Sequence, residues 1–452
     1  MTFYILLILN INKNEGDLKM KFSKKTIAAI SMATVLMFSM VGCGSQGETS
    51  KMAKNADGSV NLSFWVHETD SPEGQLYKQK VEEFNKANEG KIKVDLTQIA
   101  RTGDASGYDD KVNAAITTNS LPDVFTVDGP SVAAQADAGI ILPIDEFVDK
   151  EDLKDFNKDI INQGTYKGKL YGLGAMDSSV VIYYNKDMLA KAGITAPTSV
   201  ANAWTFDELY ENAKKMTKDD VYGLDMNLKW GGEWNTFAFL PLVQSLDGQI
   251  VADDGKTVDG SINSDKSVKA LTYIKKLVND KVVNPTPIDN SFENGKAAMV
   301  MTGTWETGGL AKYPDLKWGI MPYPVATKGA TAASPCGSWG FYMTKNCVTE
   351  KQKAAAELIK FLTNTDSCIA MYKANGMPPA RATAFNKIDE FKKEPLNVIT
   401  EQLQTTAKVR PLTPNYPVIS DQFSKAIKNT IDGMDPKKAL DEAVKQIGVQ
   451  VK

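Results

Sequence analysis

Hydrophobic and polar residues alternate along short segments between residues 58 and 130, and stretches with helical spacing separate them. Residues 60–66 alternate with period two, which predicts a half-buried strand, and residues 91–98 predict a second one. Between these segments, Ser71 and Pro72 suit the N-cap and the first turn of a helix. A further helix over residues 108–118 precedes a third apolar run. The order strand, helix, strand, helix predicts an α/β fold with a parallel, doubly wound sheet.

Polar and aromatic residues follow these predicted strands where each strand ends. His67, Glu68 and Asp70 come directly after the first strand, which also carries Trp65, and Asp128 follows the third. In open α/β sheets, ligands bind outside the carboxyl ends of the strands. The pattern therefore predicts a binding cleft at this edge, with Trp65 supporting it from the strand and His67 and Glu68 exposed. For any one of these residues, helix capping or simple solvation is the alternative.

Residues 291–305 combine a short turn, a buried strand over residues 297–301 and a glycine turn. Gly303 is expected to present Trp305 at the start of the next helix, beside Glu306. A tryptophan held at a strand end suits the flat wall of a binding cleft. An ordinary half-buried aromatic residue would fit the same pattern.

The charge and the basic residues narrow the classes of function. The formal net charge is −3, and only Arg101, Arg381 and Arg410 among the 52 basic residues are arginines. No basic patch predicts a nucleic-acid partner, and few arginines are left for bidentate clamps on phosphates. His67 is the only histidine, which removes the commonest zinc and nucleophile designs. We therefore expect no metal, no cofactor and no nucleic acid.

Residues 20–43 have the features of a secretory signal: a basic start, an apolar run and small residues before a cut. The run ends in Met40-Val-Gly-Cys43, which resembles the lipobox of bacterial lipoproteins and makes Cys43 the lipidated N-terminus. An uncleaved single-pass helix is the alternative, although the run is short beside the roughly 20 residues of a membrane span. Residues 1–19 are interpreted as an upstream mis-start before Met20, and residues 44–57 as a flexible tether.

Six segments in chain order resemble the extracellular solute-binding proteins of family 1, the sugar-binding lipoproteins of bacterial ABC importers. The most recognisable is residues 168–187, Gly-Lys-Leu-Tyr-Gly-Leu-Gly-Ala-Met-Asp-Ser-Ser-Val-Val-Ile-Tyr-Tyr-Asn-Lys-Asp. The Gly303-Thr-Trp305 end of residues 291–305 also resembles the family, in which this tryptophan stacks on a sugar ring. The other segments are residues 121–145, 204–209, 337–341, 375–381 and 435–440.

The resemblance implies a maltose-binding-protein-like architecture: a two-lobed periplasmic-binding-protein fold of type II with the ligand cleft between the lobes. It places three hinge crossovers near residues 176–180, 339–343 and 383–388. Lobe 1 is then residues 58–177 and 342–384, and lobe 2 is residues 180–338 and 388–452. Local composition does not mark these crossings, so their positions depend on the family alone. Three connections form a hinge, and ligand capture closes the cleft about it.

A neutral sugar needs flat aromatic walls and a rim of hydrogen-bonding groups. The Trp-Gly-Gly-Glu-Trp segment 230–234, Trp339 beside two glycines, and the polar residues of the first crossing supply this mixture. Trp204 and Trp318 are expected to be structural. The predicted ligand-binding residues are His67, Glu68, Asp70, Asp128, Asp177, Ser178, Trp230, Glu233, Trp234, Trp305, Glu306, Trp339 and Arg381.

Two further groups of residues are open to a second interpretation. Tyr183 and Tyr184 are adjacent, as in some ferric-binding proteins, but neighbours on a strand point to opposite faces, which argues against a metal site. Cys336, Cys347 and Cys368 have no metal-binding spacing. One disulfide among them is possible, and three small buried hydrophobic residues is the interpretation we favour.

The resemblance implies a non-enzymatic, membrane-anchored extracellular substrate-binding protein of an ABC transporter. It would act as a monomer at the outer face of the cell membrane, capture a di- or oligosaccharide and deliver it to the transmembrane subunits of the permease. A lipid-anchored glycoside hydrolase is the rival from another class, since acids near tryptophans also describe a hydrolase cleft. A binder of a charged solute, such as a glycerol phosphodiester, is the third interpretation.

Overall fold

The computed structural model describes residues 55, 58–101 and 107–451. The predicted upstream segment 1–19, the signal peptide 20–43 with Cys43, and the tether 44–57 lie outside these described residues, apart from Asn55. Within the described ranges, no helix combines the length and apolar character that a membrane crossing requires.

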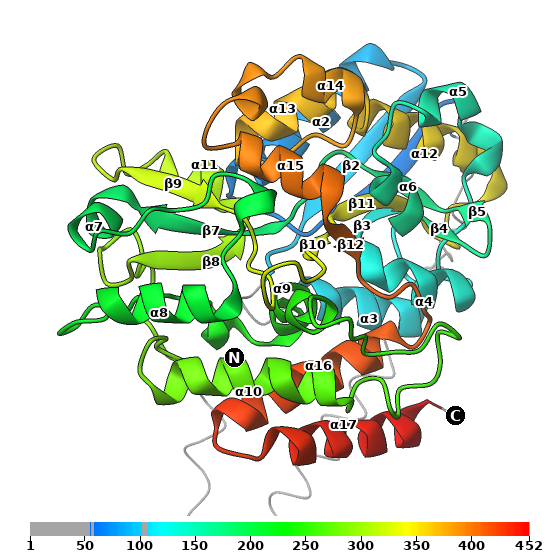
Figure 1. The fold of residues 1–452 in the computed structure, drawn as a ribbon. Coiled ribbons are helices and arrows are strands. Elements are labelled where there is room, and N and C mark those ends of the chain that lie inside the picture. The colour runs from blue at the N-terminus through cyan, green and yellow to red at the C-terminus, as the bar shows by residue number, and fades with distance from the viewer. Residues whose placement is uncertain (1–54, 56–57, 102–106, 452) are drawn as a thin grey trace, which may run out of the picture. The chain divides into compact units, whose positions relative to one another are not determined.

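A five-stranded sheet with the order β2-β1-β3-β11-β6 organises the first part of the folded body (Figure 1). Its strands are β1 (Val60–Val66), β2 (Ile92–Gln98), β3 (Val124–Asp128), β6 (Gly172–Gly174) and β11 (Trp339–Met343). The helices between its first three strands are α2 (Pro72–Ala87) and α3 (Tyr108–Thr118). The predicted bounds of the first strand and of the 108–118 helix are confirmed.

The alternation along β1 has the structural cause that the sequence suggests. Val60, Leu62, Phe64 and Val66 are buried while the residues between them are more exposed. The strand pairs in parallel with β2 along its whole length and with β3 at its far end. At its exit, Ser71 caps α2 by accepting a hydrogen bond from the backbone N–H of Gly74 at 3.0 Å.

The parallel pairing expected for the first three strands is confirmed, but the sheet also contains antiparallel pairs. β11 enters from far along the chain and pairs antiparallel with both β3 and β6. This pairing sets Trp339 opposite Asp128. A prediction from the order of neighbouring elements could not include a strand inserted about 200 residues later in the chain.

A second, three-stranded sheet with the order β8-β7-β9 is antiparallel. Its strands are β7 (Val180–Asn185), β8 (Met299–Gly303) and β9 (Trp318–Met321). Adjacent tyrosines on β7 contact different cores, because Tyr183 is fully buried in one cluster and Tyr184 packs beside another. The two rings therefore lie on opposite faces of the strand, as the strand geometry predicts.

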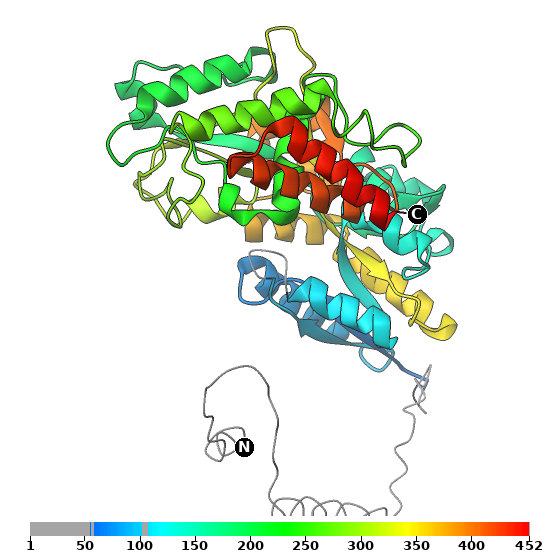
Figure 2. The ribbon, with the colours of Figure 1, turned by 90° about the horizontal axis from the view of Figure 1, so that it is seen from below.

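The remaining elements cover these sheets or connect them. α16 packs against α17, α9 and α10, and Figure 2 shows α16 and α17 side by side. The short strands are β4 (Thr165–Tyr166), β5 (Lys169–Leu170), β10 (Ser334–Cys336) and β12 (Ala407–Val409). The helices are α4 (Val132–Asp137), α5 (Lys150–Leu153), α6 (Lys158–Gln163), α7 (Lys186–Lys191), α8 (Phe206–Met216), α9 (Gly232–Gln244), α10 (Asp265–Asn279), α11 (Glu306–Leu310), α12 (Thr349–Leu362), α13 (Thr365–Asn375), α14 (Ala382–Asn386), α15 (Asn397–Thr405), α16 (Tyr416–Ile431) and α17 (Pro436–Gln450).

Two large hydrophobic cores divide the chain into interleaved stretches. One contains buried residues of β1, α2 and α12, and its first stretch ends at Met176. The other contains residues of β7, α9, α10 and α16, and begins at Val180. Trp305 is half-buried and packs against both. The predicted lobe boundaries stay a prediction. Trp339, at the start of the second predicted crossing, pairs with Asp128 and so belongs to the five-stranded sheet.

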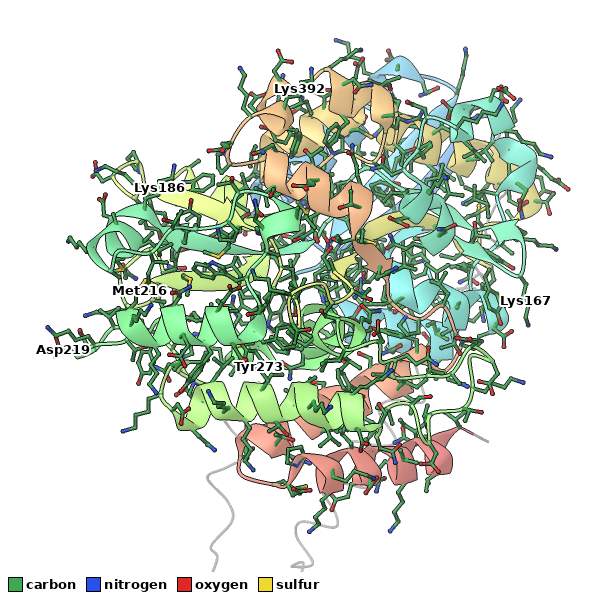
Figure 3. All side chains as sticks on the ribbon, viewed as in Figure 1. Lys167, Lys186, Met216, Asp219, Tyr273 and Lys392 are labelled. Carbon is green, nitrogen blue, oxygen red and sulfur yellow. The ribbon has the colours of Figure 1, made fainter. Side chains whose placement is uncertain are left out.

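Lysines and cysteines occupy contrasting environments. Lys167, Lys186 and Lys392 are exposed at the outer edge of the folded body (Figure 3). Cys336, Cys347 and Cys368 are buried, with exposed fractions of 1% or less. Burial raises the pKa of the Cys336 and Cys368 thiols far above the ordinary value. The cysteines therefore behave as small buried hydrophobic residues.

Candidate functional site

A cavity of about 540 Å³ is lined by residues of the five-stranded sheet, such as Asp128 and Trp339, and by residues that pack around the three-stranded sheet, such as Trp234 and Trp305. This volume is within the usual range for small-molecule sites. Aromatic side chains supply several of its walls, and charged groups lie between them. The lining residues are His67, Glu68, Ser71, Pro72, Glu73, Arg101, Asp128, Met176, Ser178, Trp230, Gly231, Gly232, Glu233, Trp234, Phe237, Trp305, Gly308, Gly309, Lys312, Gly337, Ser338, Trp339, Ala374, Asn375, Met377 and Arg410.

One wall is a cluster of four aromatic rings, which we call the indole wall: Trp230, Trp234, Phe237 and Trp305. The Trp230 and Trp234 rings meet edge to face with centroids 4.9 Å apart. Trp234 also meets Trp305 edge to face at 6.1 Å, and Phe237 lies nearly parallel to Trp305 at 6.2 Å. These are the preferred geometries of aromatic pairs, so the rings hold one another in place. Trp230 and Trp305 remain partly exposed.

Gly303 makes the position of Trp305 possible. A Cβ atom at Gly303 would lie 2.2 Å from ring atoms of Trp305, closer than any real contact. The indole therefore folds back against the last residue of β8, and Trp305 caps α11. The predicted strand over residues 297–301 is β8 (Met299–Gly303), so Gly303 belongs to the strand and the turn that presents Trp305 follows it at residues 304–305. Gly303 is needed for close approach rather than for an unusual backbone conformation.

Trp339 forms a separate aromatic surface at the start of β11. His67 stacks on its indole with centroids 3.9 Å apart and planes 13° from parallel. The guanidinium of Arg101 lies 4.6 Å from the same ring, a cation–π contact. His67 is buried and burial lowers its pKa well below the ordinary value, so the imidazole is neutral at pH 7. The exposed position expected for His67 is therefore wrong.

Arg410 links strand β3 of the five-stranded sheet to helix α9 beside the cavity. Its guanidinium donates two hydrogen bonds to the Asp128 carboxylate, at 3.0 and 3.1 Å, and a third to Glu233 at 2.7 Å. Asp128 ends β3, whereas Glu233 lies in the first turn of α9. Arg410 also lies 4.7 Å from the ring of Phe237. One buried cation thus fixes two carboxylates and one ring of the indole wall.

Glu233 has few acceptor positions left for a ligand. Besides Arg410, the hydroxyls of Tyr416 and Ser420 donate to its carboxylate. Asp128 is likewise held by Arg410 on both oxygens. Both carboxylates are therefore engaged mainly by groups of the protein itself.

The loop from β1 to α2 carries the polar residues on the other side of the cavity. Gln98 donates hydrogen bonds to the backbone carbonyls of Glu68, Thr69 and Gly74, which fastens this loop to β2. A Cβ atom at Gly74 would lie 2.0 Å from the carbonyl oxygen of Thr69, so only glycine allows this packing. The Glu68 carboxylate accepts a hydrogen bond from the Ser71 hydroxyl at 2.6 Å.

The structure brings together nine of the thirteen predicted ligand-binding residues on this cavity, where they are His67, Glu68, Asp128, Ser178, Trp230, Glu233, Trp234, Trp305 and Trp339. Four predicted residues are not among the lining residues: Asp70, Asp177, Glu306 and Arg381. Asp70 is exposed on the loop before α2. Burial and the nearby Glu293 carboxylate raise the pKa of Glu306 to about 7.

Asp177 lies behind the cavity and joins two connecting segments. Its carboxylate accepts hydrogen bonds from the backbone N–H groups of Ser178 at 2.8 Å and Gly337 at 3.0 Å. The side chain is buried, and burial raises its pKa to about 7. Ser178 does line the cavity and donates its hydroxyl to the Gly337 carbonyl. Asp177 therefore holds the backbone that supports the cavity.

Arg381 does not reach the cleft edge, where it was expected. Its guanidinium forms a bidentate pair with Asp152, both contacts at 2.7 Å, and a further bond of 3.3 Å to Asp155. The side chain is 5% exposed and also lies over the ring of Phe156. Arg381 and Arg410 each clamp carboxylates of the protein itself, so these clamps are part of the fold.

Sequence reasoning missed the cavity residues whose partners are remote in the chain. Asn375 is the last residue of α13, Arg410 directly follows the short strand β12, and Glu73 lies in the first turn of α2, where an acid reads as an ordinary helix start. Arg101 and Phe237 also line the cavity. The rarity of arginine was the one available signal, because two of only three arginines prove to lie on this surface.

Comparisons with known proteins identify the family that the chain resembles in sequence. The family described as bacterial extracellular solute-binding protein matches residues 79–398. A maltodextrin-binding protein of Bacillus subtilis is 25% identical over 91% of this chain and 93% of its own length. A galactooligosaccharide-binding protein of the same organism is 24% identical over 96% and 99%.

Solved structures show the same fold. An ABC substrate-binding protein from Listeria monocytogenes, in complex with cycloalternan, matches with a TM-score of 0.74 at 24% identity, over 86% of this chain and 98% of that one. The maltose/maltodextrin-binding domain from Bdellovibrio bacteriovorus, bound to maltotriose, gives 0.73 at 23% over 87% and 100%. The expected periplasmic-binding-protein fold is confirmed. Because the family match covers more than half of the sequence, the chain belongs to the bacterial extracellular solute-binding proteins.

Proposed function

We propose that this chain is the substrate-binding protein of an ABC transporter and that it captures a neutral di- or oligosaccharide in the 540 Å³ cavity. The observation that carries the proposal is the indole wall facing a cavity that also holds Trp339 and the Arg410 ion pairs. Flat rings match the apolar faces of sugar rings, while other polar lining residues, such as Glu68, Glu73 and Asn375, offer hydrogen bonds to hydroxyls. The names of the maltodextrin- and galactooligosaccharide-binding relatives support this class of ligand.

The charges around the cavity favour a neutral ligand. Arg410 is neutralised by Asp128 and Glu233, and Arg101 lies against the Trp339 ring. Lys312, on an exposed part of the rim, is the other basic lining residue. An anion such as a glycerol phosphodiester would find the buried Arg410 guanidinium already engaged by two carboxylates, which leaves the exposed Arg101 and Lys312 as the basic groups among the described lining residues. We therefore rank the neutral saccharide above the charged solute.

Closure of the cleft and delivery to the permease complete the proposal. Two lobes, residues 58–177 with 342–384 and residues 180–338 with 388–452, would close about three connecting segments when the ligand binds both. In support of this arrangement, Asp177 and Ser178 in the first predicted crossing hydrogen-bond to Gly337, two residues before the second predicted crossing. Cys43 would carry the lipid that holds the monomer at the outer face of the membrane, where the transmembrane subunits of the permease receive the ligand.

A thermal-shift screen over mono-, di- and oligosaccharides and glycerol phosphodiesters tests the proposal. A ligand that binds only the folded state raises the unfolding midpoint, by an amount set by its concentration relative to its Kd. We expect a neutral di- or oligosaccharide to give the largest shift, and calorimetry to give one site per chain. Chromatography of the same mixtures should show intact sugar. If anionic solutes alone raised the unfolding midpoint, the neutral-saccharide proposal would be refuted. Cleavage of the saccharide would instead support the glycoside hydrolase.

A further inference from the structure

Glu73 is a buried carboxyl group on the wall of the cavity, in the first turn of α2. Its side chain is 10% exposed. One carboxylate oxygen accepts a hydrogen bond from the Tyr77 hydroxyl at 2.6 Å, and the other accepts one from the Asn375 amide at 3.0 Å. His67 Nε2 lies 3.7 Å away, beyond hydrogen-bond distance.

Among the buried acids of the described residues, Glu73, Asp177 and Asp225 have no lysine or arginine at ion-pair distance, and of these three it is Glu73 that lines the cavity. Asp123 pairs with Lys351 at 3.2 Å, and Asp128 and Glu233 share Arg410. Among the described residues, the basic group at ion-pair distance from Glu73 is His67, whose imidazole is neutral. Burial is the main cause that raises the pKa of Glu73 to about 7, and the nearby Glu68 adds to it.

Glu73 lines the ligand space, and its carboxyl group has acceptor positions that its two protein donors leave open. An ionised carboxylate offers about four acceptor positions, and Tyr77 and Asn375 occupy two of them. A buried acid with spare acceptor positions and a raised pKa, in a cleft, is a candidate functional group. Hydroxyl groups are the donors that a neutral saccharide brings.

We propose that Glu73 is a specificity-determining residue of the cavity, which accepts a hydrogen bond from a hydroxyl of the bound oligosaccharide and selects it over the analogue that lacks this hydroxyl. The role rests on the proposed function. A hydrogen bond to a charged group contributes about 1.5–3 kcal/mol, which corresponds to about 10- to 150-fold in affinity. A site built around such a bond discriminates strongly against a ligand without the donor.

The proposal also predicts how affinity depends on pH. A donated hydroxyl stabilises the ionised carboxylate, so ligand binding lowers the pKa of Glu73 and affinity rises as pH increases through about 7. The other titratable or charged groups that face Glu73 are His67, Glu68, Tyr77 and Arg101. His67 is neutral, and the pKa of Tyr77 is raised well above its usual value. Neither therefore titrates near pH 7.

The experiment compares Glu73→Gln with a matched control on the same helix, Glu83→Gln. Glu83 pairs with Lys80, is 41% exposed and does not line the cavity. Calorimetry at pH 6, 7 and 8 would use the saccharide with the largest thermal shift and its monodeoxy analogues. We expect Glu73→Gln to bind about 10- to 100-fold more weakly at pH 8, to lose the pH trend, and to stop distinguishing the parent from one deoxy analogue. Glu83→Gln should behave as the unmodified protein.

Each outcome decides between the two proposals. If the unmodified chain binds no saccharide, the proposed function fails and the role of Glu73 fails with it. If it binds a saccharide but Glu73→Gln retains its affinity and pH trend, only the role of Glu73 is overturned. Should Glu73→Gln not fold, Glu73→Asp and the pH profile of the unmodified protein decide instead, because a flat profile from pH 6 to 8 contradicts an ionising acceptor.

Discussion

Replacing Arg410 by methionine tests whether the ion pairs beside the cavity hold both the fold and the site. Methionine keeps much of the apolar stem but removes three hydrogen bonds, so Asp128 and Glu233 lose their common cation. Breaking a buried pair by removing one partner costs about 3–5 kcal/mol. The Asp128 and Glu233 side chains are 18% and 27% exposed, and water lowers the cost, so we expect about 3 kcal/mol.

Arg381→Met provides a matched control elsewhere in the same protein. Arg381 is also 5% exposed and also holds two carboxylates, but it does not line the cavity. Both variants should unfold at lower urea concentration by comparable amounts. Only Arg410→Met should weaken saccharide binding, by more than 10-fold in calorimetry, because it also frees Asp128 and the indole wall at Phe237. Equal loss of affinity in both variants would mean that general destabilisation, not the cavity, is responsible, and full affinity in Arg410→Met would refute the reasoning.

Three further predictions follow from close contacts and burial. Gly308→Ala should weaken saccharide binding, measured by calorimetry, more than Gly309→Ala does. A Cβ atom at Gly308 would lie 2.7 Å from the backbone oxygen of Asn375, whereas one at Gly309 would meet the flexible end of the Glu306 carboxylate. Equal affinities of the two variants would contradict this prediction. Gly303→Ala should destabilise the protein by about 1–3 kcal/mol through overpacking against Trp305 and shift its fluorescence, and an unchanged melting curve would count against that packing. Since the pKa of Asp177 is raised to about 7 in the folded state, the stability of the unmodified protein should fall as pH rises from about 4 to 7. Urea midpoints should show Asp177→Asn to be more stable than the unmodified protein at pH 8, and the difference in midpoint should narrow toward pH 5. A difference that does not change with pH would refute the raised pKa of Asp177.

Local patterns predicted individual elements of the fold well. The period-two alternation of β1 and the bounds of α3 follow from the residues themselves, and Ser71 caps α2 as expected. Such features depend on neighbours in sequence, because strand alternation and capping involve atoms a few residues apart. The antiparallel entry of β11 was not predictable from any local pattern.

The candidate site likewise combines features that the local sequence predicts with features that depend on residues distant in the chain. The sequence by itself pointed to Trp305 at a strand end and to Trp230 and Trp234 in a glycine-containing polar segment, while the family resemblance placed Trp339 at a crossing, and all four line one cavity. Only the tertiary structure decided which polar groups join them. Arg410 meets Asp128 across 282 residues of sequence, and Asn375 meets Glu73 across 302. The physical reason is that a buried polar or charged group must be paired by a hydrogen-bond or ion-pair partner, and local sequence spacing carries no record of a partner that is distant in the chain.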